Sequence, residues 1–274
     1  MTWARMHGTK PFDGFVLDQN SQADPALQTM LEELDRGLRV KHEMQPQQTA
    51  VGVLDLKSVR LAMVRPDLMM YGASIPKVSI LLAFFQQNPE AIDHLTAETQ
   101  RELGLMIKNS SNEMATQFSR SLGLKTIQRV LDTYGFYDSK GGGGIWMGKH
   151  YGDNSERIGD PVGDHSHAVT VRQLLRFYLL LEQGKLISKE ASARMRQILA
   201  SPDIPHDPIK FVKGLEGRNV EILRKWGSWE DWLHDSAIIQ ADDRHYVLVG
   251  LTHHPAGDEY LSELAAAVED VLKG

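Results

Sequence analysis

Predicted strands lie near the two ends of this chain, and helical patterns fill the middle. β-rich apolar runs cover residues 49–56 and 60–64, and others cover residues 220–225, 237–241 and 246–252. Because each sheet face must be buried against another element, the simplest assembly pairs these strands with one another. The sequence therefore predicts an α+β, sandwich-like fold, in which an antiparallel sheet formed from both chain ends carries an inserted helical lobe.

The helices are predicted from apolar residues at helical spacing. The first should begin at Pro25, because Asp24 is a good N-cap residue and Leu27 and Leu31 follow on one face. Residues 75–85 are apolar nearly all round, which predicts a buried helix whose N-terminus lies at Ser74. Other helical patterns cover residues 97–108, 113–121, 126–134, 170–183, 189–199 and 258–272.

These patterns suggest one domain, residues 1–274, with two lobes. Residues 24–68 and 210–274 should form the α/β lobe, and residues 69–209 the helical lobe. Residues 138–166 are rich in glycine and aspartate and lack periodicity, so we expect an Ω-like loop near a functional site.

Composition excludes several classes of protein. The net charge of −6, without a Lys/Arg-rich stripe, argues against a nucleic-acid partner. The absence of cysteine excludes disulfides, thiolate metal sites and a cysteine nucleophile. The longest apolar run, residues 78–85, is too short to span a bilayer.

One candidate nucleophile stands beside a candidate base. Ser74 and Lys77 lie three residues apart in the string SIPK, so both face one side of the predicted helix. A serine hydroxyl needs such a base, and burial would lower the pKa of the lysine enough for it to accept a proton. The alternative is that Ser74 only caps the helix while Lys77 extends to solvent.

Two further strings are suggestive together and weak alone. Ser110 and Asn112 occur in the string SSNE, which also fits a capping box with Ser110 as the cap and Glu113 reaching back. Lys225 and Gly227 occur in the string KWGS at the end of a predicted edge strand. Taken alone, Lys225 would be an ordinary solvated lysine.

The three strings occur in the order of the S-x-x-K, S-x-N and K-T-G elements of penicillin-recognising enzymes. The chain thus resembles class A β-lactamase-like serine hydrolases of the β-lactamase and penicillin-binding protein superfamily. The resemblance covers most of the chain. It implies hydrolysis of a β-lactam or related amide through an acyl-serine intermediate, as in antibiotic resistance, with no cofactor and no metal.

The resemblance also assigns roles to single residues. Ser74 would be the nucleophile, and Ser110 would pass a proton to the leaving nitrogen. Asn112 would hold the side-chain amide of the substrate, and Lys225 would face its carboxylate and lower the pKa of the base. Backbone N–H groups of Ser74 and Ser228 would form the oxyanion hole.

The sequence departs from the family pattern at three positions. Trp226, before Gly227, replaces the usual threonine or serine and removes a hydroxyl from the substrate-binding strand. Ser111 replaces the usual aspartate. Glu156 is the only glutamate of the long loop, but it lacks the local pattern of the family's deacylating glutamate and is a weak candidate for that role.

These departures leave alternatives open. The chain could be a DD-peptidase or esterase, or a slowly deacylating module that binds β-lactams or peptidoglycan.

Two other motifs are incomplete. Gly143, Gly148 and Lys149 imitate a phosphate loop, but His150 replaces the required Ser or Thr. The histidine pairs near residues 165 and 253 lack the spacing of zinc hydrolases.

Partners and compartment follow from the same reasoning. We expect a monomer that takes a small-molecule substrate, with no nucleic acid and no membrane span. Residues 1–18 lack the apolar core of a secretory signal. The resemblance implies a periplasmic or secreted protein with its signal trimmed, and a cytoplasmic location stays open.

Overall fold

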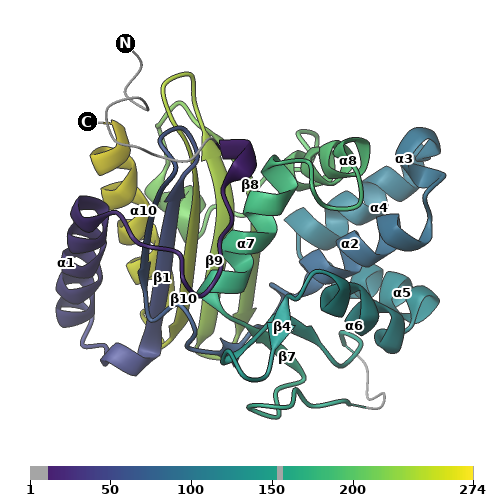
Figure 1. The fold of residues 1–274 in the computed structure, drawn as a ribbon, viewed down its shortest axis with the longest axis horizontal. Coiled ribbons are helices and arrows are strands. Elements are labelled where there is room, and N and C mark those ends of the chain that lie inside the picture. The colour runs from purple at the N-terminus through teal and green to yellow at the C-terminus, as the bar shows by residue number, and fades with distance from the viewer. Residues whose placement is uncertain (1–11, 153–156, 274) are drawn as a thin grey trace.

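The computed structural model describes residues 12–152 and 157–273, and its centre is one five-stranded antiparallel sheet (Figure 1). The strand order is β2-β1-β10-β9-β8. The strands are β1 (Thr49–Asp55), β2 (Arg60–Val64), β8 (Glu221–Trp229), β9 (Trp232–Gln240) and β10 (His245–His253). Because β1 pairs with β10 from Thr49 opposite Thr252 onward, both chain ends build one sheet, as predicted.

Helices cover both faces of this sheet. On one face lie α1 (Pro25–Lys41) and α10 (Gly257–Lys273), and on the other lies α7 (Val171–Glu182) (Figure 1). Adjacent β1 residues therefore enter different cores, with Val53 packing toward α1 and α10 and Leu54 toward α7. The α+β prediction is confirmed.

The remaining helices lie beyond α7 (Figure 1). They are α2 (Lys77–Gln87), α3 (Ala91–His94), α4 (Ala97–Lys108), α5 (Asn112–Leu122), α6 (Leu124–Thr133) and α8 (Lys189–Ala200), while the short α9 (Phe211–Gly214) contacts α10. All eight predicted helices are present, as α1, α2, α4, α5, α6, α7, α8 and α10, whereas α3 and α9 were not predicted. The division of the chain into two lobes stays a prediction.

Two expectations need correction. Helix α2 begins at Lys77 instead of Ser74, because residues 72–76 form turns with i to i+3 hydrogen bonds and Pro76 has no N–H to donate. The stretch over residues 138–166 is also less irregular than expected. Its described part pairs into short strands, β4 (Tyr137–Asp138), β5 (Gly143–Gly144) and β6 (Trp146–Met147), and β7 (His167–Val169) bridges β6 to β3 (Met70–Tyr71).

A buried carboxylate ties α1 to the sheet and to α10. Asp35 is 1% exposed and accepts hydrogen bonds from Thr49 Oγ1 (2.7 Å), Tyr260 Oη (2.7 Å), Arg65 Nη2 (2.7 Å) and Arg39 Nε (3.0 Å). Burial alone would raise the pKa of Asp35, but these hydrogen bonds together hold it below its ordinary value. Asp35 is therefore charged in the fold and fully partnered.

Removing this carboxylate should destabilise the protein strongly. We expect Asp35→Ala to lower the free energy of unfolding by about 3–5 kcal/mol, because it leaves Arg65 without its buried partner. The exposed Asp132 on α6 is the control, since Asp132→Ala should change that free energy by less than about 0.5 kcal/mol. Denaturant titration measures both. Because the folded pKa is lowered, the contribution is complete above the ordinary aspartate pKa and lost as the pH falls through the folded value.

None of the helices over residues 12–152 and 157–273 combines the length and the apolar character that a membrane crossing requires.

Candidate functional site

Ser74 lies in the strained turn between β3 and α2. Ala73, directly before it, has a φ of 45°, which residues other than glycine rarely adopt. The Tyr151 hydroxyl donates to the carbonyl of Ala73 at 2.9 Å and holds this conformation. Among the described residues, neither the hydroxyl nor the backbone N–H of Ser74 has a hydrogen-bond partner. Both groups are therefore available to a substrate, and Ser74 is not the cap of α2.

Lys77 is fully buried at the start of α2 and does not extend to solvent. Its ammonium donates to the Ser110 carbonyl, to Ser110 Oγ (3.3 Å) and to Asn112 Oδ1 (2.8 Å), and it lies 4.4 Å from the centre of the Tyr151 ring. Burial lowers the pKa of Lys77 to about 7. A lysine with this pKa can give and take a proton at neutral pH, as a catalytic base must.

Ser110 stands between two lysines. Its Oγ lies 3.3 Å from Lys77 Nζ and 2.9 Å from Lys225 Nζ. A φ of 58° at Ser110 places both its carbonyl and its side chain on these amines. The capping-box alternative is wrong, because Ser111 is the N-cap of α5 and accepts from Met114 N at 3.2 Å. The Ser110 hydroxyl is therefore free to connect the two amines.

Lys225 is buried as well, on the edge strand β8. Its ammonium donates to Ser110 Oγ and to the carbonyl of Trp226. Burial lowers the pKa of Lys225 well below its usual value, and the charge of Lys77 lowers it further. Two ammonium groups that share one hydroxyl repel each other, which favours the neutral form of one amine.

Gly227 allows β8 to approach Ser74. A Cβ atom at this position would lie 2.9 Å from the backbone N of Ser74 and 3.2 Å from both Gly72 O and Ile75 N. Backbone atoms cannot move aside as side chains do, so only glycine fits here. The indole N–H of the neighbouring Trp226 is not available to a substrate, because it donates to Lys108 O at 3.1 Å.

Ser74 opens into a pocket of about 320 Å³. Asn112 and Ser228 line the same pocket, and the hydrogen bond from Lys77 to Asn112 Oδ1 connects it to Ser110 and Lys225. The described lining residues are Tyr71, Ala73, Ser74, Asn112, Lys149, His150, Tyr151, Gly152, Ser166, His167, Ser228 and Trp229. The long loop reaches the site as expected, because it supplies residues 149–152 and 166.

Carboxylates are absent from that described lining, and Glu156 lies outside the described residues. The loop instead contributes Tyr151, which stacks on His167 with ring centres 4.4 Å apart. Burial lowers the pKa of His167 to about 4, so this imidazole is neutral. Sequence reasoning missed Tyr151 because nothing in its local pattern places it above Lys77.

Three of the histidines considered as metal ligands, His165, His167 and His253, take part in aromatic packing. Trp232 stacks on His253 at 3.6 Å, and Tyr71 lies within about 6 Å of both His165 and His167. Within the ranges that the structure describes, no group of three or more His, Cys, Asp and Glu is arranged to hold a metal ion.

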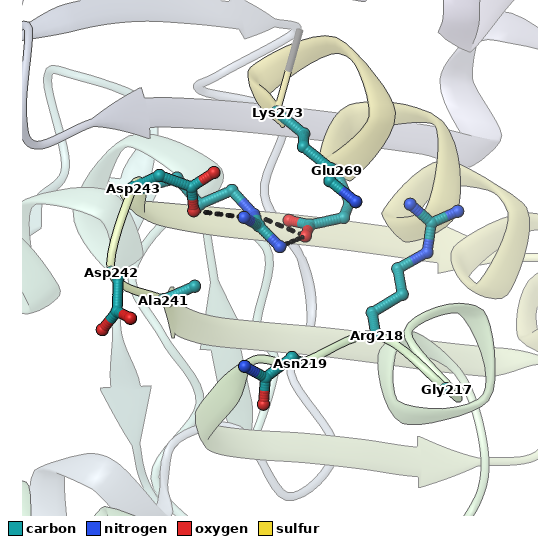
Figure 2. Close-up of a pocket in the computed structure, with 9 residues that line it drawn as sticks. Gly217, Arg218, Asn219, Ala241, Asp242, Asp243, Glu269 and Lys273 are labelled. Atoms are coloured by element: carbon teal, nitrogen blue, oxygen red, sulfur yellow. Dashed lines mark hydrogen bonds and ion pairs between the residues drawn. The ribbon is translucent and has the colours of Figure 1, made fainter.

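A larger cavity of about 580 Å³ lies between the β9–β10 turn and the end of α10 (Figure 2). Its arginines point at carboxylates: Arg244 donates to Glu269 at 2.6 Å and also pairs with Asp243, and Arg218 pairs with Asp270. Tyr246 donates to the same buried Glu269 at 2.7 Å. These charges neutralise one another, and the lining residues that the structure describes include no hydroxyl or thiol nucleophile.

Comparisons with known proteins give one family and many similar folds. The profile of the Beta-lactamase enzyme family matches residues 90–272. A search among curated proteins returned no significant match.

Three solved structures illustrate the similarity in fold. A β-lactamase from Sphaerobacter thermophilus is 15% identical, with 89% of this chain and 97% of that chain covered and a TM-score of 0.70. The TLA-3 extended-spectrum β-lactamase is 12% identical, with 89% and 100% covered and a TM-score of 0.71. A PBP-A mutant, solved as an acyl-enzyme complex with penicillin-G, is 17% identical, with 89% and 97% covered and a TM-score of 0.66. At these identities the likeness concerns the fold alone.

Proposed function

Because the chain belongs to the Beta-lactamase enzyme family, we propose that it is a serine hydrolase that opens β-lactam or related amide bonds through an acyl-Ser74 intermediate. The observation that carries the proposal is the buried, hydrogen-bonded trio of Lys77, Ser110 and Lys225, in which Lys77 also donates to Asn112, a residue of the pocket that Ser74 lines. Within the trio, Lys77 can be neutral at pH 7, and it is hydrogen-bonded to the hydroxyl of Ser110.

Acylation requires that the Ser74 hydroxyl loses its proton and that the leaving nitrogen gains one. Neutral Lys77 Nζ takes the Ser74 hydroxyl proton as Oγ forms a bond to the carbonyl carbon. When the C–N bond breaks, the Ser110 hydroxyl gives its proton to the leaving nitrogen and regains one from Lys77. Lys225, hydrogen-bonded to Ser110 Oγ, stabilises negative charge as it develops on Ser110, while burial is what lowers the pKa of Lys77.

The negative charge that develops on the carbonyl oxygen during acylation must be stabilised by separate hydrogen-bond donors. The free N–H of Ser74 and the backbone of Ser228 on β8 are our candidates for the oxyanion hole, because Gly227 brings that strand against the Ser74 turn. Asn112, exposed in the pocket wall, is the candidate for binding a substrate amide.

A second candidate function is penicillin binding with slow release, or a DD-peptidase or esterase activity. The Tyr151 ring lies over Lys77, and the described pocket lining has no carboxylate to activate water. Deacylation would then depend on Lys77 alone. A long-lived adduct favours this candidate, and an adduct that decays with product release favours the hydrolase.

The test compares wild type with Ser74→Ala, using Ser121→Ala on the exposed face of α5 as a matched control. Wild type and Ser121→Ala should hydrolyse a chromogenic cephalosporin or a small ester at equal rates. Ser74→Ala should lose at least about 10³-fold of that activity, because the covalent route is closed. Equal activity in Ser74→Ala would remove the proposal.

A further inference from the structure

The Trp226 side chain lies against two buried lysines. Its ring centre is 5.2 Å from Lys225 Nζ and 5.0 Å from Lys210 Nζ, and both ammonium groups lie over the ring. Lys225 and Lys210 are each 0% exposed. A charge buried to this degree is costly unless partners compensate for it, and the face of a tryptophan ring is the best aromatic partner for a cation. Trp226 thus supplies part of what keeps these amines inside the protein.

Two helices hold the Trp226 ring in this orientation. Its indole N–H donates at 3.1 Å to the carbonyl of Lys108, the last residue of α4. The Lys108 side chain is anchored in turn, because its ammonium donates to Ala200 O (2.6 Å) and Ser201 O (2.9 Å) at the end of α8. The ring therefore cannot turn away from Lys225 without breaking its hydrogen bond to α4.

The contacts of Lys225 direct its ammonium to Ser110. The ammonium donates to Ser110 Oγ at 2.9 Å and to the carbonyl of Trp226, and the Trp226 ring lies against it. An ammonium carries three N–H groups, one for each of these contacts. Lys225 is absent from the described lining of the Ser74 pocket. The functional group that Lys225 reaches is therefore the Ser110 hydroxyl.

The charge on Lys225 depends on such partners. Burial lowers the pKa of Lys225, and three nearby cations lower it further against the opposing charge of Asp235. These cations are Lys77, Arg224 and Lys210. The Trp226 ring acts in the same direction as Asp235, because its face favours the charged amine. A charged amine is the stronger hydrogen-bond donor, and it stabilises negative charge on an oxygen beside it.

We propose that Trp226 is a positioning residue whose ring holds the Lys225 ammonium on Ser110 Oγ, and that this contact serves proton donation to the leaving group. The inference rests on the proposed function for that reaction. As the C–N bond breaks, the Ser110 proton passes to the leaving nitrogen, and the Lys225 ammonium stabilises the charge that develops on Ser110 Oγ. Lys225 keeps its own protons, and Ser110 regains one from Lys77. Trp226 is absent from the described pocket lining and acts through Lys225.

The choice of leaving group separates this role from a general loss of structure. The nitrogen of benzylpenicillin must be protonated as it leaves, whereas the phenolate of p-nitrophenyl phenylacetate leaves without a proton. Trp226→Leu should slow acylation by benzylpenicillin about 10- to 100-fold, part of the usual contribution of a general acid, and acylation by the ester less than about threefold. Trp226→Phe keeps a ring against Lys225, so it should keep the ratio of the two rates within about threefold of the wild-type ratio.

Trp146→Leu is the matched control, with a thermal melt of each variant as a check on folding. Trp146 also donates its indole N–H to a backbone carbonyl, that of Ile158 at 2.9 Å, and it is absent from the described pocket lining. Its loss should change both acylation rates by the same factor. The proposal is overturned if folded Trp226→Leu slows both compounds equally, or if Trp226→Phe alters the ratio as much as Trp226→Leu does.

A measurement without substrate keeps this test apart from the proposed function. In protein with isotope-labelled lysine, NMR reports how fast the Nζ protons exchange with water, and Lys225→Met identifies the Lys225 signal. These protons should exchange slowly in wild type and at least about 10-fold faster in Trp226→Leu, because the ring no longer shields them. Unchanged exchange would overturn the proposal. Faster exchange without acylation by either compound would keep the role of Trp226 and remove the hydrolase.

Discussion

Lys77→Met should slow acylation of Ser74 by about 10²- to 10⁴-fold, the usual contribution of a positioned general base. Methionine has a similar length and suits a buried position, so the fold should survive. The substitution removes the amine that accepts the Ser74 proton and the donor to Ser110 and Asn112. Stopped-flow measurement of adduct formation, with a thermal melt as a check on folding, tests this prediction.

The pH dependence of acylation reports the same base. Because the neutral amine is the reactive form, the wild-type acylation rate should rise with pH and level off above a pH of about 7, the lowered pKa of Lys77. Lys77→Arg keeps the positive charge but cannot accept a proton, so it should be as slow as Lys77→Met. Rapid, pH-independent acylation in Lys77→Arg would show that the charge alone suffices.

Gly227→Ala should lower the acylation rate by about 10²- to 10³-fold, the effect of losing one oxyanion donor. The added Cβ would lie 2.9 Å from Ser74 N, so β8 must move away from the Ser74 turn. Because the contact lies at the edge of the sheet, we expect the melting temperature to change much less than the rate. The acylation rate and a thermal melt are measured together.

Gly37→Ala is the matched control for this substitution. Gly37 lies within α1, and a Cβ there would meet no atom within 4 Å. The change should leave acylation unaltered and add up to about 1 kcal/mol of stability, since alanine is the better helix former. If Gly227→Ala acylates as fast as Gly37→Ala, the close approach of β8 is irrelevant to catalysis.

The sheet and the longer helices could be predicted because their signals are local. In α1, Asp24 accepts from Leu27 N as its N-cap character predicts, and Pro25 begins the helix. The strands Thr49–Asp55 and His245–His253 pair across almost the whole chain. That pairing follows from both being apolar runs that must be buried, although no local signal fixes their register.

The site depends on tertiary contacts that sequence patterns do not contain. Ser110 fits a cap by sequence, and only its φ of 58° and the approach of Lys225 from a distant strand place it between two amines. Lys210 precedes an unpredicted four-residue helix, and its bond to Ser228 joins residues with no shared motif. Such contacts follow from the assembled fold, so the motifs name Ser74 and Lys77 but not their surroundings.

Locating the acyl group on the chain tests the central claim most directly. Wild-type protein is incubated with benzylpenicillin, quenched in acid, digested and mapped by tandem mass spectrometry. The account predicts one modified peptide, carrying the intact penicilloyl mass on Ser74, and none in Lys77→Arg at the same early time. Modification at another residue, or no modification over many hours with penicillins, esters and peptides alike, would contradict it.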